Sequence, residues 1–314
     1  MANNIEIADR KKKELSRTII KFFENYAKDA SVEDLEQLDM TTLVSHLYTR
    51  LDKMSAAIEQ SHFLDPIDLV FKQSGDNIVN ILPQNYFLHD FRFDIYDPSI
   101  SDAYRRYRIR HIDDIVQGTI RAVRNAIERA LRKKKTKEEI LKTYQRTLGL
   151  NEQQEQAVEN YENALKNNSA MALYNQNRNK EKDGMVEAAL IAGIPLAQYQ
   201  INRLVSQYIN NSKLYRANLI AETELLSVAS LGEYEGIVQA GIAGAVELTG
   251  LRKYWITQED ERVRANHVAI PVMNPNGVEF FDVFRTPLGG MRYPRDEMGV
   301  PENVINCRCF LVYK

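Results

Sequence analysis

Apolar side chains recur at three- and four-residue spacing along most of the chain before residue 250. This period places them on one side of an α-helix. It predicts helices over residues 9–27, 43–58, 101–131 and 152–167 and, in several pieces, over 185–247. The larger N-terminal part should therefore be mostly helical, with apolar faces that need partners to cover them.

Local signals refine this pattern in three places. Thr136 is followed three residues later by Glu139, which is the spacing of a capping box at a helix start. Ser31 and Asp34 have the same spacing with a shorter acid. Residues 63–100 hold three prolines and scattered aromatics without a sustained period, so we expect loops there, with at most a short hairpin.

The hydrophobic period changes to two after residue 250. Residues 251–257 and 304–313 are typical of strands, and Asn276-Gly277 indicates a tight turn inside a hairpin. In the last strand, alternation puts five residues on the face expected to be buried, namely Ile305, Cys307, Cys309, Leu311 and Tyr313.

Together these patterns predict an α+β protein, with a mostly helical N-terminal part and a small C-terminal α+β module containing a few-stranded sheet. We expect three consecutive regions. They are a helical N-terminal region with an irregular aromatic and proline-containing stretch at 1–100, a helical middle region with a basic segment at 101–213, and the C-terminal module at 214–314.

Composition agrees with a globular protein, since 44% of the 314 residues are hydrophobic and 27% are charged. No apolar run reaches the roughly 18 residues of a membrane helix, so no membrane partner is expected. Cys307 and Cys309 are the two cysteines, and their i, i+2 spacing is poor for an unstrained disulfide. We interpret both as thiols made in a reducing cytoplasm.

Positive charge is concentrated between Ser101 and Lys137. This segment contains 12 Lys and Arg but only 4 Asp and Glu, whereas the whole chain has a net charge of −2. Basic rows bind phosphates without reading bases, so this segment is a candidate for DNA contact. A solvated face, or pairing with an acidic protein surface, is the alternative. The candidate DNA-contact residues are Arg105, Arg106, Arg108, Arg110, Arg132, Lys133, Lys134, Lys135 and Lys137.

A cluster of polar residues in the C-terminal module stands out. We expect Asp260 to cap a short helix that carries Arg264 and His267 on the same side. Catalysis by Asp260 with His267 is an alternative, but no serine nucleophile motif accompanies the pair, so no catalytic residue is assigned. The motif comprises Trp255, Asp260, Arg262, Arg264, His267, Asn306, Cys307, Arg308 and Cys309.

Metal binding is a further alternative for the same cluster. His267, Cys307 and Cys309 offer three zinc ligands. Structural zinc sites take four ligands and usually two residues between paired cysteines. The sequence therefore predicts neither a metal nor another cofactor, and buried thiols are the simpler interpretation. Trp255, the single tryptophan, is expected to anchor the core.

Over residues 140–314 the chain resembles the Mu F-like head morphogenesis family of phage minor capsid proteins. Three pieces carry the resemblance. They are the segment 148–161, the helix 214–224 that ends in Ala-Glu-Thr-Glu, and the strand and turn at 255–267 followed by Asn-Cys-Arg-Cys at 306–309. Glu222 stands where the family has an arginine, so the charge is reversed there.

The resemblance implies a minor structural protein of a tailed-phage head, made in the host bacterial cytoplasm and located inside the capsid near the portal. It implies a part in head assembly and DNA packaging or delivery, with no enzymatic activity. The implied partners are the portal protein and the major capsid protein, with packaged double-stranded DNA as a further candidate. The alternatives are a hydrolase or toxin-like transferase using Asp260 and His267, or a DNA-binding internal protein ejected with the genome.

Overall fold

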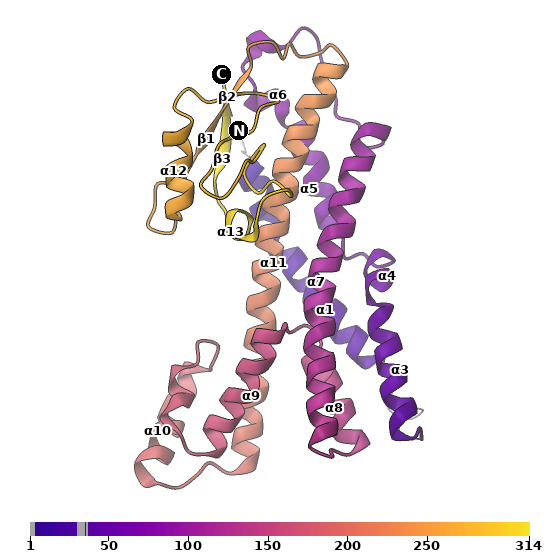
Figure 1. The fold of residues 1–314 in the computed structure, drawn as a ribbon, viewed down its shortest axis with the longest axis vertical. Helices are drawn as coiled ribbons and strands as arrows, with labels where there is room; N and C mark the ends of the chain where they lie inside the picture. The colour runs from indigo at the N-terminus through magenta and orange to yellow at the C-terminus, as the bar shows by residue number, and fades with distance from the viewer. Residues whose placement is uncertain (1–3, 30–34, 36) are drawn as a thin grey trace. The chain divides into compact units, whose positions relative to one another are not determined.

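The computed structural model describes residues 4–29, 35 and 37–314 and has the expected α+β class (Figure 1). The bounds of the helices are α1 Asn4–Lys28, α3 Met40–Asp52, α4 Met54–Glu59, α5 Asp65–Asp76, α6 Ile78–Ile81, α7 Pro98–Arg132, α8 Lys137–Thr147, α9 Glu152–Lys166, α10 Asp183–Ala192, α11 Gln198–Ile242, α12 Ala265–Met273 and α13 Pro301–Val304. The strands are β1 Arg252–Ile256, β2 Val278–Glu279 and β3 Phe310–Tyr313.

The helices predicted from the three-to-four period are confirmed, with ends shifted by a few residues. The capping box at the start of α8 is also present. The Thr136 hydroxyl accepts from the Glu139 amide at 3.3 Å, and the Glu139 carboxylate accepts from the Thr136 amide at 2.8 Å. The expected cap at Ser31 and Asp34 lies outside the described residues. Within the described part of the chain, no helix is both long and apolar enough to cross a bilayer.

The prediction of loops across 63–100 is wrong for its first half, where α5 and α6 form. Pro66 lies in the first turn of α5, a position where the missing N–H is not needed. Ile67, Val70 and Phe71 then give the helix a buried face. The proline marks a helix start here, and only the stretch after α6 is irregular.

The chain divides into two compact units that do not follow the three consecutive regions expected from the sequence. Unit 1 comprises Met1–Ser16, His62–His111 and Asn218–Lys314, and unit 2 comprises Arg17–Ser61 and Ile112–Ala217. The division is discontinuous because α1, α7 and α11 each contribute residues to both units.

Unit 2 is helical and has an apolar core and a buried arginine. Among the buried core residues are Leu150, Val158, Tyr161, Leu165, Ile201, Leu204, Val205 and Tyr208. Arg216 donates to the carbonyl oxygens of Ile115 and Gly149 at 2.8 and 3.0 Å, and to the Thr119 hydroxyl at 2.7 Å. Burial lowers the pKa of Arg216 to about 10. Its hydrogen bonds join α11 to α7 and to the turn before α9.

Unit 1 contains the three-stranded sheet, in the order β2-β1-β3 with both pairs antiparallel. Figure 1 shows the sheet beside the C-terminal half of α11, with α12 next to β1. The turn at Asn276-Gly277 forms, and Gly277 takes a left-handed φ of 61°. It links α12 to β2, so the expected hairpin is wrong. The last strand is also shorter than predicted, because α13 occupies Pro301–Val304 and only Phe310–Tyr313 pairs with β1.

Close helix packing in unit 1 depends on two glycines of α11. A Cβ added to Gly232 would lie 2.4 Å from the Phe71 carbonyl oxygen, and one added to Gly236 would lie 2.7 Å from the Gly75 carbonyl oxygen. Real Cβ atoms do not approach backbone that closely, so these glycines let α11 approach α5. The glycines at 232, 236, 241 and 244 predict from sequence either a weakened helix or the close approach of another element, and the second is found at Gly232 and Gly236.

Gly232→Ala should therefore lower the free energy of unfolding by about 1 to 3 kcal/mol, the usual cost of overpacking. Gly184→Ala in α10 is the matched control, because a Cβ there meets nothing within 4 Å. Alanine should leave its stability unchanged or raise it by up to about 1 kcal/mol. Urea denaturation of both variants tests this, and equal effects would contradict the close approach.

Candidate functional site

The two halves of the C-terminal motif meet in unit 1. Asp260, in the loop after β1, accepts a hydrogen bond from the Arg308 guanidinium at 2.7 Å. Gln258 donates to the Arg308 carbonyl oxygen at 3.1 Å, and Arg264 donates to the Ile305 carbonyl oxygen. The loop after β1 and the segment between α13 and β3 are therefore held together by hydrogen bonds that each of them donates to the other.

Asp260 does not cap a helix as expected, because α12 begins only at Ala265 with Arg264 at its N-cap. Instead Asp260 closes a turn, in which its carboxylate accepts from the Arg262 amide at 3.1 Å and its carbonyl accepts from the Val263 amide at 3.0 Å. The hydrogen bond from Arg308 lowers the pKa of Asp260. Since residues 260–264 are not helical, Asp260 and His267 do not share a helical face.

His267 lies in the first turn of α12 and is only 2% exposed. Its Nδ1 is 3.5 Å from the Cys309 Sγ, and its ring meets the Trp255 ring edge-on at 6.1 Å between centroids. Ligand atoms of His267, Cys307 and Cys309 all lie within 4.8 Å of one another. The structure thus brings this trio together, and no hydrogen bond joins Asp260 to His267 within residues 37–314.

The two thiols are buried and not joined by a disulfide. A hydrogen bond from Cys309 holds the pKa of the Cys307 thiol well below its ordinary value, with smaller contributions from His267 and Arg295. The pKa of Cys309 is raised by the same bond and by burial.

The space beside this trio is small. A cavity of about 10 Å³ is lined by the trio together with Arg262, Asn306 and neighbouring residues. That volume accommodates about one water molecule. Trp255 is 2% exposed and packs edge-on against Phe284 at 5.4 Å, so its predicted role as a core anchor is confirmed.

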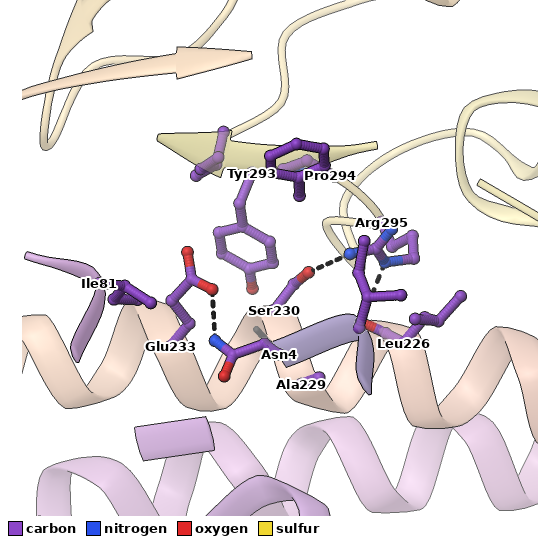
Figure 2. Close-up of a pocket in the computed structure, with 12 residues that line it drawn as sticks. Asn4, Ile81, Leu226, Ala229, Ser230, Glu233, Tyr293, Pro294 and Arg295 are labelled. Carbon is purple, nitrogen blue, oxygen red and sulfur yellow. Dashed lines mark hydrogen bonds between the residues drawn. The ribbon is translucent and has the colours of Figure 1, made fainter. Parts of the chain in front are cut away.

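Arg295 is a central residue that the sequence analysis missed. Its guanidinium donates to the carbonyl oxygens of Cys307 and Cys309 at 2.8 and 2.7 Å. On the α11 side it donates to the Leu226 carbonyl at 2.9 Å and to the Ser230 hydroxyl at 2.6 Å (Figure 2). Arg295 also takes a left-handed φ of 65°, for which the sequence Tyr-Pro-Arg-Asp gives no signal.

Figure 2 shows a second cavity, of about 40 Å³, with Glu233, Ser230 and Arg295 along it. The Glu233 carboxylate accepts a hydrogen bond from the side-chain amide of Asn4 and another, at 2.7 Å, from the Tyr313 hydroxyl. Burial raises the pKa of Glu233. The volume fits one or two waters and is too small for an organic substrate.

The Ala-Glu-Thr-Glu piece of α11 also contacts the closing segment of the motif. The Asn306 amide donates to the Thr223 hydroxyl at 3.4 Å. Glu222 forms a salt bridge with Lys12 of α1. The reversed charge at residue 222 is therefore matched by a basic partner within this chain.

The basic residues proposed for DNA contact are divided between the units, and most bond to partners in their own unit. In unit 1, Arg105 pairs with Asp102 at 2.9 Å, Arg108 lies 3.9 Å from Asp68, and Arg110 donates to the Glu297 carbonyl. Burial raises the pKa of Glu235 to about 7, and the positive charge of Arg106 acts to lower it.

In unit 2, Lys133 and Lys135 pair with Glu159 and Glu139 at 2.7 and 2.6 Å. Arg132 pairs with Glu128 at 3.3 Å. Two residues complete the set, Lys137, which donates to the Leu38 carbonyl, and Lys134, which is exposed at a left-handed φ of 53°. The groove of about 590 Å³ beside Lys133 and Lys135 is lined by glutamates as well as lysines, so its charge is mixed.

Lys253 is a buried titratable group that the sequence analysis did not single out. Its side chain is fully buried, its Nζ donates to the Arg292 carbonyl at 2.7 Å, and three aromatic rings surround it at 5.5 to 5.7 Å. Burial lowers the pKa of Lys253 to about 7. Alternation in β1 puts Lys253 and Trp255 on one face, which was the signal available in the sequence.

Lys253→Met should raise the free energy of unfolding at pH 7 by about 1 kcal/mol or more, as replacement of a buried charge often does. The folded-state pKa lies below the ordinary 10.5, so the unfolded chain binds the extra proton between about pH 7 and 10. The wild type therefore gains stability as pH rises through this window, and the advantage of the variant should shrink. Urea denaturation at both ends of the window tests this, and a constant difference would contradict it.

Comparisons with known proteins give no relative for this chain. No protein-family model matches it, and no curated protein or solved structure matches it either.

Proposed function

We propose that the chain is a minor structural protein of a tailed-phage head, located inside the capsid near the portal and acting in head assembly and DNA packaging or delivery. The proposal rests on the resemblance of residues 140–314 to the Mu F-like head morphogenesis family. One observation supports it most, which is that two of the three pieces bond to each other within unit 1. The end of the helix 214–224 contacts the closing Asn-Cys-Arg-Cys segment, and that segment contacts the loop after β1.

These bonds use the motif residues as structural connections. Arg308 holds Asp260, and Thr223 holds the Asn306 amide. Trp255 fills the core beneath them. These polar groups already form hydrogen bonds between segments that are distant in sequence. This arrangement fits a folding and assembly module better than a reactive centre.

An enzyme built on Asp260 and His267 is not favoured by this arrangement. A general base needs its partner within hydrogen-bond reach. Asp260 is exposed and bonded to Arg308, whereas His267 is buried against Cys309. The cavities of about 10 and 40 Å³ beside the motif offer no room for a substrate.

Protein partners are favoured by exposed apolar side chains in each unit. In unit 1, Val268 and Val272 of α12 are 53% and 76% exposed, and Phe281 is 63% exposed. In unit 2, Ile191 and Tyr199 are 88% and 73% exposed. Val268 and Val272 are one turn apart on α12 and so form one apolar strip, and contiguous exposed apolar surface marks protein-binding sites. We propose the portal protein and the major capsid protein as these partners.

Packaged DNA is a weaker candidate partner, because glutamates already pair with several of the basic side chains. A basic side chain that is paired with a glutamate is less available to neutralise a phosphate. Fewer counterions are then released from the DNA, and binding is weaker. An internal protein ejected with the genome remains the alternative placement in the particle.

Deleting the gene from the phage that encodes this chain should sharply lower the yield of infectious particles, and expression of the wild-type chain in trans should restore it. Asp260→Asn should complement as well as the wild type, because the amide oxygen still accepts from Arg308. Asp282→Asn is the matched control, since Asp282 is another exposed acid of the same module.

Plaque counts and electron microscopy of the purified particles provide the readout. Normal infectious yield from the deletion phage would contradict the proposal. Loss of complementation by a folded Asp260→Asn chain, with Asp282→Asn active, would instead favour an enzyme.

A further inference from the structure

We propose that His267, Cys307 and Cys309 bind one Zn²⁺ ion, which fastens α12 to the segment before β3. This inference goes beyond the proposed role in the phage head and does not depend on it. The three residues supply an imidazole nitrogen and two sulfurs, which are the donors that zinc prefers in proteins.

The distances fit a shared metal ion. Zinc bonds to nitrogen at about 2.0 to 2.1 Å and to sulfur at about 2.3 Å, so two ligands of a tetrahedral ion lie roughly 3.6 to 3.8 Å apart. The His267 Nδ1 and the Cys309 Sγ are 3.5 Å apart, and the three ligand atoms all lie within 4.8 Å of one another. Closing the widest pair by about 1 Å needs only small side-chain rotations.

The hydrogen bonding of His267 points the same way. The Nδ1 of His267 contacts the Cys309 sulfur at 3.5 Å, and His267 also acts on the Cys307 thiol. The nitrogen that would bind the ion therefore already faces the two sulfurs, as expected for ligands of one metal. Within residues 37–314, the Nε2 has no hydrogen-bond partner, so no bond fixes the ring in another orientation.

Both sides of the trio are fixed by bonds that do not involve the ligand atoms. Asn266 donates to the Asn303 side chain at 2.8 Å, and Arg264 donates to the Ile305 carbonyl, so the start of α12 is tied to the segment that carries the cysteines. On the other side, Arg295 holds the carbonyls of Cys307 and Cys309. Ligands positioned in this way need little reorganisation to bind an ion.

The fourth ligand of the ion would be a water molecule. The cavity of about 10 Å³ beside the trio fits one water, and no further Cys, His, Asp or Glu lines it. Two thiolates balance the charge of Zn²⁺, and binding releases the thiol protons to solvent. Because the cavity has no room for a substrate, the ion would stabilise the module and not catalyse a reaction.

The test is a zinc titration of the full chain, kept reduced with a phosphine and freed of metal with a chelator. We expect one Zn²⁺ per chain, measured by competition with a chromophoric chelator, and a higher melting temperature with zinc. Cobalt in place of zinc should give the near-ultraviolet charge-transfer band of thiolate ligands and the visible bands of a tetrahedral ion.

Cys309→Ser and Cys307→Ser should each weaken zinc binding by about 100-fold or more. Loss of a residue that only supports a metal ligand lowers metal affinity by about 10- to 100-fold, and loss of a ligand itself should cost at least as much. His62→Asn is the matched control, because the His62 side chain is 97% exposed and lies outside the module. It should bind as the wild type does.

Binding of less than one ion per wild-type chain, or equal affinity in the variant lacking both cysteines, would overturn the proposal. If the cysteine variants do not fold, the cobalt spectrum of the wild type decides alone. Absence of the thiolate band would then reject the site, and its presence would support it.

Discussion

The buried guanidinium of Arg295 is the interaction on which the rest of the C-terminal module depends. It is 4% exposed and donates to four acceptors, two on α11 and two on the backbone of Cys307 and Cys309. A buried charge is very costly unless its donors are satisfied, so this arrangement is stable only when α11 and the segment before β3 are both in place. The arginine therefore makes the two segments fold as one structure.

The remaining motif contacts follow from that connection. With the backbone of 307–309 held against α11, the sulfurs lie beside His267, and Arg308 reaches Asp260 in the loop after β1. The partly exposed pair of Asp260 and Arg308 adds little stability by itself, because solvent screens its charges. Its contribution is to fix the orientation of the loop. This division of roles explains why so many polar residues can gather here around cavities that are too small for a substrate.

Hydrophobic period was sufficient to predict the fold class and the main helices, because each apolar face lies within one continuous segment. It failed where the deciding partner is distant in sequence. Arg295 bonds to Leu226 and Ser230, 69 and 65 residues away, and no local pattern indicates such contacts. Lys253 lies on the inward face that alternation in β1 predicts. Because lysine is seldom buried, the residue type argued against this position and the burial was not predicted. The cap assigned to Asp260 failed because a turn precedes α12.

The most direct test of the proposed role is to quantify this chain by mass spectrometry in purified full particles and in particles emptied of DNA. A fixed head component near the portal should be present in both at the same low copy number. Absence of the chain from purified particles would contradict the proposed function. Loss of the chain on emptying would contradict its fixed position and identify it as an internal protein that leaves with the genome.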